Sequence, residues 1–166
     1  MHGITHGITT MFYERENHMI NLISTTTIHR PVRQVFDFIS TAENDIQWQH
    51  GALASFQITK KPIGLGTLFS SLGHFMGRRL QGKFEVIEFE PNKKYGFRSL
   101  SGTIQLQTLY TFEIFPGGTR VDASMHVIQN GFFQLSDAFV TKFAKKQLKE
   151  NLATLKPFWN PGNDHS

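Results

Sequence analysis

The stretch "TIQLQTLYTFEIFPGGTRVDASMHVI", residues 103–128, carries the clearest structural signal in the chain. Apolar and polar side chains alternate along two runs, which the Pro-Gly-Gly turn at 116–118 separates. Such a period of two places alternate side chains on opposite faces of a β-strand. One face of the two strands then comprises Ile104, Leu106, Thr108, Tyr110, Phe112, Ile114, Val121, Ala123, Met125 and Val127. The stretch therefore predicts an antiparallel hairpin with this face toward a core.

Upstream segments extend the pattern toward the N-terminus. Four further runs read as strands joined by short turns, at residues 52–60, 66–77, 78–91 and 95–102. Six consecutive strands with short connections are typical of an antiparallel meander. The β-branched run "INLISTTTIH", residues 20–29, predicts a seventh strand before them.

Two short helices are predicted between that first strand and the meander. In "RPVRQVFDFIS", residues 30–40, apolar side chains recur at i, i+3, i+4 and i+7, and Pro31 suits a first helical turn. The apolar residues are Val32, Val35, Phe36 and Ile39. We expect a second helix over residues 41–49, with Thr41 as its N-cap and Gly51 ending it.

A long helix is predicted near the C-terminus, over residues 133–157, and would be roughly 35 Å long. Its apolar stripe consists of Val140, Ala144, Leu148, Leu152 and Leu155, and Phe139 and Phe143 widen it. Such a helix has to bury its stripe against the apolar face of the sheet. The expected fold is α+β, a helix-grip in which a curved seven-stranded antiparallel sheet wraps around the C-terminal helix. An apolar cavity between sheet and helix is a reasonable consequence.

We expect one domain over residues 20–160, a flexible N-terminal extension over 1–19 and a short tail over 161–166. The 166-residue length suits a single domain. The extension contains a repeated His-Gly-Ile-Thr, and its histidines lack carboxylate or cysteine partners at useful spacing. We therefore expect no metal and no cofactor.

Composition excludes several other classes of protein. The chain has no Cys, which removes disulfides, thiolate zinc sites and Cys nucleophiles. No apolar run reaches the ~20 residues of a membrane span, and no signal-peptide pattern begins the sequence, so a cytoplasmic location is expected. The net charge is +4, and the lysines of residues 142–149 read as a solvated helix face. We expect no nucleic-acid partner, because exposed aromatics and a recognition motif are missing.

The order of these elements resembles the START/Bet v 1-like helix-grip (SRPBCC) superfamily, and within it the polyketide cyclase/dehydrase-like group. The resemblance covers residues 20–158. It is carried by "RPVRQVFDFIS", Trp48, "PIGLGT" at 62–67, "GRRLQGKFEVIEFEPNKKYGFRSLSG" at 77–102 and "YTFEIFPGGTRVD" at 110–122. The resemblance implies a hydrophobic ligand held between the sheet and the C-terminal helix. It supplies no catalytic motif that transfers residue by residue.

Candidate site residues follow from the predicted cavity. The candidate ligand contacts are Trp48, Tyr110, Phe112, Met125, Phe139 and Phe143. Tyr110 and His74 are the candidates for proton transfer, since both carry titratable groups. In "AENDIQWQHG", residues 42–51, Trp48 is either a gate to the cavity or a hydrophobic plug, and His50 is a loop residue.

Three functions stay open at this point. The leading hypothesis is a module that binds a small hydrophobic, aromatic or lipid-like molecule. The first alternative is a cyclase or dehydratase that uses the same cavity, so the sequence leaves open whether the protein is an enzyme. The second alternative is an interaction protein with a collapsed core, whose partner could be a second copy in a homodimer. That last function predicts an exposed apolar patch in place of an internal void.

Overall fold

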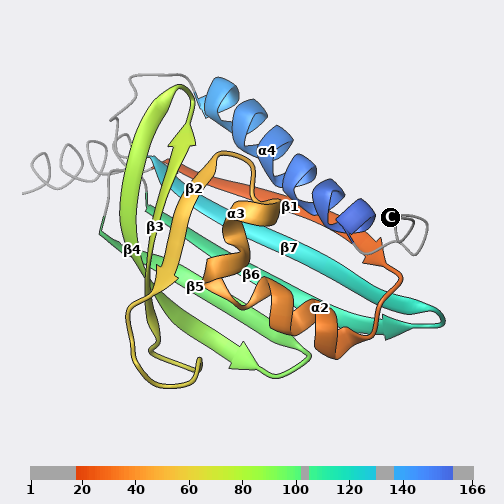
Figure 1. Ribbon diagram of the computed structural model, residues 1–166. Helices are drawn as coiled ribbons and strands as arrows, with labels where there is room; N and C mark the ends of the chain where they lie inside the picture. Colours follow the sequence, from red (N-terminus) through yellow and green to blue (C-terminus); the bar gives the residue numbers. More distant parts are fainter. Residues whose placement is uncertain (1–17, 102–104, 130–136, 159–166) are drawn as a thin grey trace, which may run out of the picture.

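The computed structural model describes residues 18–101, 105–129 and 137–158. A curved seven-stranded antiparallel sheet has the order β1-β7-β6-β5-β4-β3-β2, and a long helix lies across it (Figure 1). The strands are β1 (His18–Ile28), β2 (Ala52–Gln57), β3 (Leu68–Phe75), β4 (Arg78–Glu90), β5 (Lys94–Ser101), β6 (Gln105–Phe115) and β7 (Gly118–Gln129). The helices are α2 (Val32–Ile39), the 3-10 turn η1 (Ala42–Asn44), α3 (Asp45–Trp48) and α4 (Asp137–Phe158). The predicted helix-grip fold is confirmed.

The first strand, β1, forms one edge of the sheet, and β2 forms the other. β1 pairs with β7, and every other neighbouring pair follows the order of the chain from β2 to β7. In the β6–β7 hairpin, Tyr110 lies opposite Ala123 and Phe112 lies opposite Val121. These four side chains are buried, as the alternation predicts. The prediction that Ile114 faces the core is wrong, because 74% of this residue is exposed. β5 begins at Lys94, which pairs with Thr111, so Ile114 lies beyond the part of β6 that β5 flanks.

The helices divide the concave face of the sheet between them. α4 packs mainly along β1, and α2 lies over β6 and β7 (Figure 1). The predicted stripe of α4 is confirmed, because all five of its residues are buried. Its two flanking aromatics are exposed, by 51% for Phe139 and 44% for Phe143. They precede Val140 and Ala144 by one residue, which turns them about 100° away from the stripe.

Local details of the short helices differ from the prediction. Pro31 is the N-cap residue of α2, one position before the first turn. Thr41 precedes η1 but gives no side-chain cap, because its hydroxyl donates back to the Asp37 carbonyl oxygen at 2.6 Å. The second helix is split into η1 and α3 and ends at Trp48. Gly51 instead occupies the turn into β2, with a φ of 80°.

The predicted domain bounds stay a prediction. β1 begins at His18, two residues earlier than expected. The rest of the N-terminal extension and the C-terminal tail lie outside the described residues, as do residues 133–136 of the predicted long helix. No helix in the described part of the chain combines the length and the apolar character needed to cross a membrane.

Gly118 provides a test of how closely β7 approaches the end of β1. A Cβ at Gly118 would lie 2.1 Å from the Ile28 carbonyl oxygen, a backbone atom that cannot move aside. We expect Gly118→Ala to lower the free energy of unfolding by about 3 kcal/mol in urea titrations. Gly64→Ala is the control, because a Cβ there meets nothing within 4 Å. Equal losses in the two variants would contradict this account.

Candidate functional site

A cavity of about 200 Å³ lies between the concave face of the sheet and the helices α3 and α4. Its apolar lining comes from strands β3 to β7 and from α4. The apolar lining residues include Phe69, Phe75, Leu80, Phe84, Phe97, Leu106, Tyr110, Met125, Val127, Ala144 and Leu148. Because the sheet curves away from α4, the side chains of the two layers do not meet everywhere.

Aromatic rings form one wall of the cavity. Phe69 stacks on Phe84 with ring centroids 5.1 Å apart, and Phe97 meets both rings edge-on at 5.2 and 5.7 Å. These three residues belong to three adjacent strands, β3, β4 and β5. Since such rings are rigid and have no polar atoms, the wall offers an apolar surface of fixed shape.

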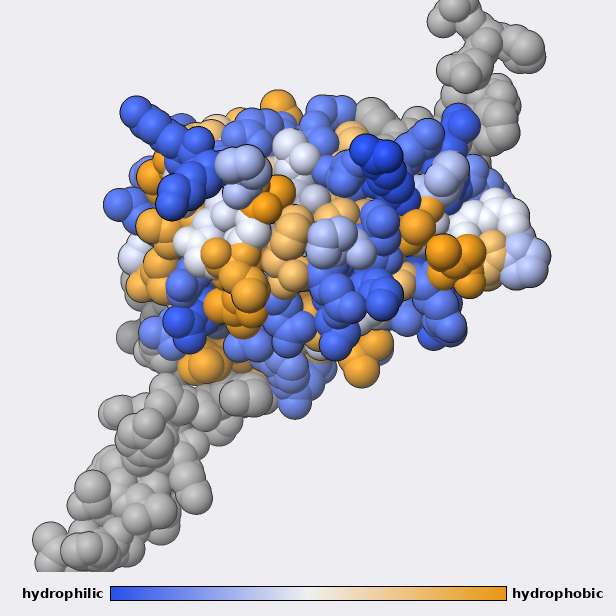
Figure 2. Space-filling model, turned by 90° about the horizontal axis from the view of Figure 1, so that it is seen from below, coloured by the Kyte–Doolittle hydropathy of each residue, from blue (hydrophilic) through white to orange (hydrophobic). Residues whose placement is uncertain are grey.

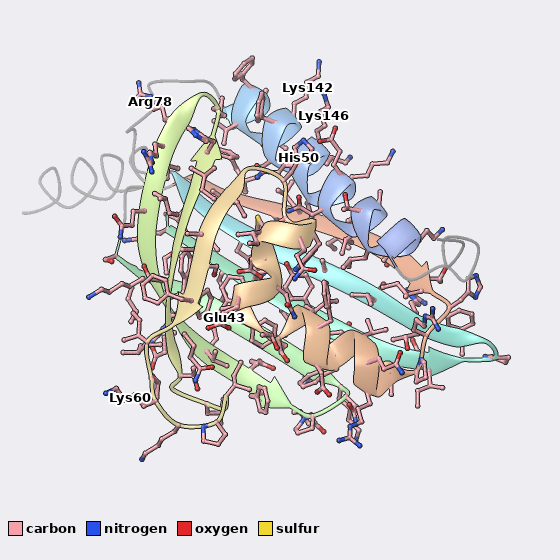
Figure 3. All side chains as sticks on the ribbon, viewed as in Figure 1. Glu43, His50, Lys60, Arg78, Lys142 and Lys146 are labelled. Carbon is pink, nitrogen blue, oxygen red and sulfur yellow. The ribbon has the colours of Figure 1, made fainter. Side chains whose placement is uncertain are left out.

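The loop after α3 forms the opposite rim and is held by α4. The Asn151 side chain accepts a hydrogen bond from the His50 backbone N–H at 2.6 Å, and Gln147 Nε2 donates to the His50 carbonyl oxygen at 2.8 Å. The His50 ring lies 3.6 Å from a carboxylate oxygen of Glu150. Figure 3 shows His50 beside α4, whereas Lys142 and Lys146 point away from the sheet. His50 is thus a loop residue, as predicted, and also lines the cavity rim.

Asp45 is the principal functional candidate that sequence analysis missed. It is only 7% exposed, it lines the cavity, and its Oδ2 accepts a hydrogen bond from the Ser55 hydroxyl at 2.9 Å. Burial raises the pKa of Asp45 to about 7, and the Ser55 hydrogen bond opposes this shift in part. A carboxyl with this pKa exchanges a proton near neutral pH. The sequence contains one signal for the burial of Asp45. Asp45 precedes Trp48 by three residues, which places both side chains on one face of the short helix.

Tyr110 lies on the sheet beneath this helix. Its ring is 6.2 Å from that of Tyr95 on the neighbouring strand, and the two rings are nearly parallel. Burial, together with the nearby charge of Asp45, raises the pKa of both tyrosines. Tyr110 is therefore protonated at neutral pH and can donate a hydrogen bond into the cavity that it lines.

The other predicted site residues separate into three groups. Met125 and His74 line the cavity together with Tyr110, and His74 is exposed at its rim. Phe112 is buried but does not line the cavity, because its ring packs edge-on against Phe36 of α2 at 5.2 Å. Phe139 and Phe143 also lie outside the lining. Phe143 instead packs on Phe75 from the far side, with ring centroids 6.0 Å apart.

Trp48 is a plug in this structure. It is 2% exposed, it does not line the cavity, and its ring meets Tyr110 edge-on at 5.9 Å. Two buried polar atoms, Trp48 Nε1 and Thr108 Oγ1, have no hydrogen-bond partner among the described residues. Thr108 is a lining residue of the cavity, but its Oγ1 atom has almost no accessible surface, and Trp48 is buried and is not a lining residue.

A family model identifies the family of the chain, and similar solved structures share its fold. The model of the family described as "Polyketide cyclase / dehydrase and lipid transport" matches residues 19–157. A START superfamily protein from Mycobacterium smegmatis has a similar structure, with a TM-score of 0.71 and 16% identity over 86% of this chain and 97% of that one. Ginseng major latex-like protein 151 from Panax ginseng gives a TM-score of 0.68 at 10% identity, over 86% of this chain and 99% of that one. No curated protein sequence matches the chain.

A third similar structure has two domains. It is the di-domain ARO/CYC BexL from the BE-7585A biosynthetic pathway, with a TM-score of 0.69 and 14% identity. The match covers 93% of this chain and 54% of that one. Identities this low show a shared fold only.

The raised pKa of Asp45 predicts a pH-dependent cost of folding. Between about pH 4 and 7 the unfolded chain releases this proton while the folded chain keeps it, so stability falls as pH rises through that window. The shift from 3.8 to about 7 corresponds to a loss on the order of 4 kcal/mol. We expect Asp45→Asn to match the wild type at pH 4 and to exceed its free energy of unfolding by that amount at pH 8.

Urea unfolding at both pH values measures this difference. The nearby charge of Glu43 also raises the pKa of Asp45, whereas Asp45 raises the pKa of Tyr95 and Tyr110, and all three groups stay in place in the variant. Glu88→Gln, which removes an exposed carboxylate of β4, controls for the loss of one negative charge. A difference between Asp45→Asn and wild type that does not change with pH would refute the assignment.

Proposed function

Because the chain belongs to the polyketide cyclase/dehydrase and lipid-transport family, we propose that it binds a small apolar or aromatic molecule in the cavity between the sheet and α4. The observation that carries this proposal is the cavity itself, which keeps about 200 Å³ free behind an aromatic wall. An apolar protein cavity of about 150 Å³ suffices to bind benzene. The size therefore favours a molecule of one or two rings, bound by contact with Phe69, Phe84 and Phe97.

Apolar burial supplies most of the affinity in this proposal. A one-ring molecule that buries about 150 Å² gains about 4 kcal/mol at 25 cal/mol per Å². That gain corresponds to a dissociation constant on the order of 1 mM, and a larger ring system binds more tightly. The physiological ligand is then expected to fill the cavity more completely than a single ring does.

Filling the cavity with a side chain tests the binding function. Leu106 lines the cavity, and Ile114 is exposed on the same strand, so Leu106→Trp and Ile114→Trp make a matched pair. Isothermal titration with p-xylene and indole should give saturable binding to wild type and to Ile114→Trp. Leu106→Trp should bind at least tenfold more weakly, because its indole occupies the space of the ligand. If the two variants bind equally well, or the wild type binds neither probe, the proposal fails.

A second candidate function, a cyclase or dehydratase, is favoured by one observation. Acid–base catalysis needs a titratable group in the cavity, and Asp45 has a pKa of about 7 and lines it. In such a reaction the Asp45 carboxylate would take a proton from the carbon next to a carbonyl. The resulting carboxylic acid would return the proton to a departing hydroxyl, which leaves as water. Asp45 then replaces Tyr110 and His74 as the first candidate for proton transfer.

This catalytic function has its own test. Incubation with an aromatic β-hydroxy ketone and mass spectrometry would detect the loss of water. We expect any turnover to disappear in Asp45→Asn while p-xylene still binds, since the amide keeps the shape of the carboxyl but cannot carry the proton. Turnover that survives Asp45→Asn unchanged would exclude Asp45 as the acid–base group.

The third function, an interaction protein with a collapsed core, receives less support. The space between the sheet and α4 is one that a collapsed core would lack. Large apolar side chains are exposed near the edge strand β2, among them Phe56 at 53% and Leu65 at 71%. On the face shown in Figure 2, however, apolar groups alternate with hydrophilic ones and form no continuous apolar surface.

A further inference from the structure

The outer side of α4 carries aromatic and basic side chains together. Phe139, Lys142, Phe143 and Lys146 are spaced i, i+3, i+4 and i+7, so they share one face of the helix, which we call the basic–aromatic face. All four side chains are exposed, and Lys142 and Lys146 point away from the sheet (Figure 3). The rings of the two phenylalanines lie 6.4 Å apart. A helix face that only meets water is polar, so two neighbouring exposed aromatic rings indicate a contact surface.

The same part of α4 has a surplus of positive charge. Residues 138–149 contain four lysines and no acidic residue. The next residue, Glu150, places its carboxylate 3.9 Å from Lys146 Nζ and 3.6 Å from the His50 ring, so it offsets one of the lysine charges. The remaining surplus attracts an anionic partner.

The β3–β4 hairpin extends this positive surface. Its tip carries the exposed Arg78 and Arg79, and no acidic residue occurs between positions 46 and 84. Phe75, the last residue of β3, packs on Phe143 with ring centroids 6.0 Å apart. Hairpin and helix therefore present one surface in which basic groups surround aromatic rings.

The basic–aromatic face borders the rim of the cavity. Phe75, which Phe143 contacts, is a lining residue, and so is Gln147, the residue after Lys146. His74 precedes Phe75 and is an exposed lining residue. A partner that covers the basic–aromatic face is therefore next to the place where the cavity meets solvent.

Beyond the proposed binding function, we propose that the basic–aromatic face attaches this protein to the surface of an anionic lipid bilayer. The phenylalanine rings enter the boundary between headgroups and acyl chains, and the lysine stems lie beside them while the ammonium groups reach the lipid phosphates. Each lysine near an anionic surface strengthens the attachment about fivefold. The attached protein holds its cavity rim at the lipid, so a ligand dissolved in the bilayer reaches the cavity without a long path through water.

The shape of the surface favours a bilayer over a nucleic acid. Single-stranded nucleic acids also bind through basic and aromatic side chains, but they lie in a positively charged groove that follows their backbone. Here the side chains stand on the outward side of one helix, which is convex. Phenylalanine supplies apolar area without a polar atom, which suits insertion among lipids.

Sedimentation of the full chain with lipid vesicles tests the attachment. Vesicles of equal parts phosphatidylglycerol and phosphatidylcholine should bind the protein roughly tenfold or more tightly than vesicles of phosphatidylcholine alone, because only the former are anionic. Raising the salt concentration from about 0.1 M to about 1 M shortens the Debye length from about 10 Å to about 3 Å and should release most of the bound protein.

Two matched pairs of lysines test where the bilayer binds. The double variant Lys142→Gln, Lys146→Gln should weaken binding to the anionic vesicles roughly tenfold or more, since it removes two charges from the basic–aromatic face. Lys60→Gln with Lys61→Gln removes the same charge, and Lys60 lies at the opposite end of the molecule (Figure 3). This control should keep an affinity close to that of wild type.

A second matched pair tests the aromatic contribution. Phe139→Gln should weaken vesicle binding about tenfold, because apolar area no longer enters the lipid. Leu65→Gln, in the connection between β2 and β3, is the control, since Leu65 is also apolar and is 71% exposed. It should bind vesicles as wild type does. Both side chains are exposed, so thermal melting of each variant should match wild type.

Several outcomes would overturn the proposal. Equal losses in the two lysine pairs would show that net charge alone drives binding. Binding to a single-stranded DNA oligonucleotide without binding to vesicles would make the partner a nucleic acid. A dimer in analytical ultracentrifugation that Phe139→Gln dissociates, without vesicle binding by wild type, would assign the face to a second copy.

The vesicle measurements need no cavity ligand, so this proposal and the proposed function fail separately. Vesicle binding with the expected variant losses supports the attachment even if p-xylene does not bind, in which case only the binding function fails. Binding of p-xylene without binding to anionic vesicles overturns the attachment and leaves the binding function standing.

Discussion

The packing of α4 across a curved sheet is the constraint on which the rest of the structure depends. The helix buries one stripe, including Val140, Leu148 and Leu155, and it packs mainly along β1 at one side of the sheet. The strands β3 to β5 curve away from it, and one straight helix cannot cover both halves of such a surface. The short helices α2 and α3 close part of the remaining concave face, and the uncovered part becomes the cavity.

The position of α3 then decides the chemistry of that cavity. Trp48 and Asp45 lie on the inner face of a four-residue helix. The packing of the Trp48 indole in the core therefore also buries the Asp45 carboxyl. Ser55 on β2 hydrogen-bonds this carboxyl but does not offset its burial, and the pKa of Asp45 is raised to about 7. Asn151 and Gln147 of α4 fix the following loop through the His50 backbone, which holds α3 in place.

Much of the fold could be predicted because its signals are local. Alternation in β6 and β7 placed Tyr110, Ala123 and Val127 on the inner face, and the spacing of apolar residues placed Ala144 and Leu152 inside α4. The site was predictable only in part. Tyr110 and Met125 line the cavity as expected, whereas Phe112 is screened by α2 and Phe143 lies on the outer flank of α4. Periodicity assigns a face to a side chain, but it does not say which neighbouring element covers that face.

The sequence by itself determined the seven strands, the long helix, their antiparallel order and the apolar character of the interior, because each depends on a repeat within one segment. Only the tertiary structure decided that Asp45 is buried, that Thr108 lacks a partner and that Trp48 is a plug. Each of these facts depends on the distance between residues far apart in the chain, such as Trp48 and Tyr110, whose rings meet at 5.9 Å. Burial and hydrogen-bond satisfaction are properties of the assembled layers, so no single segment encodes them.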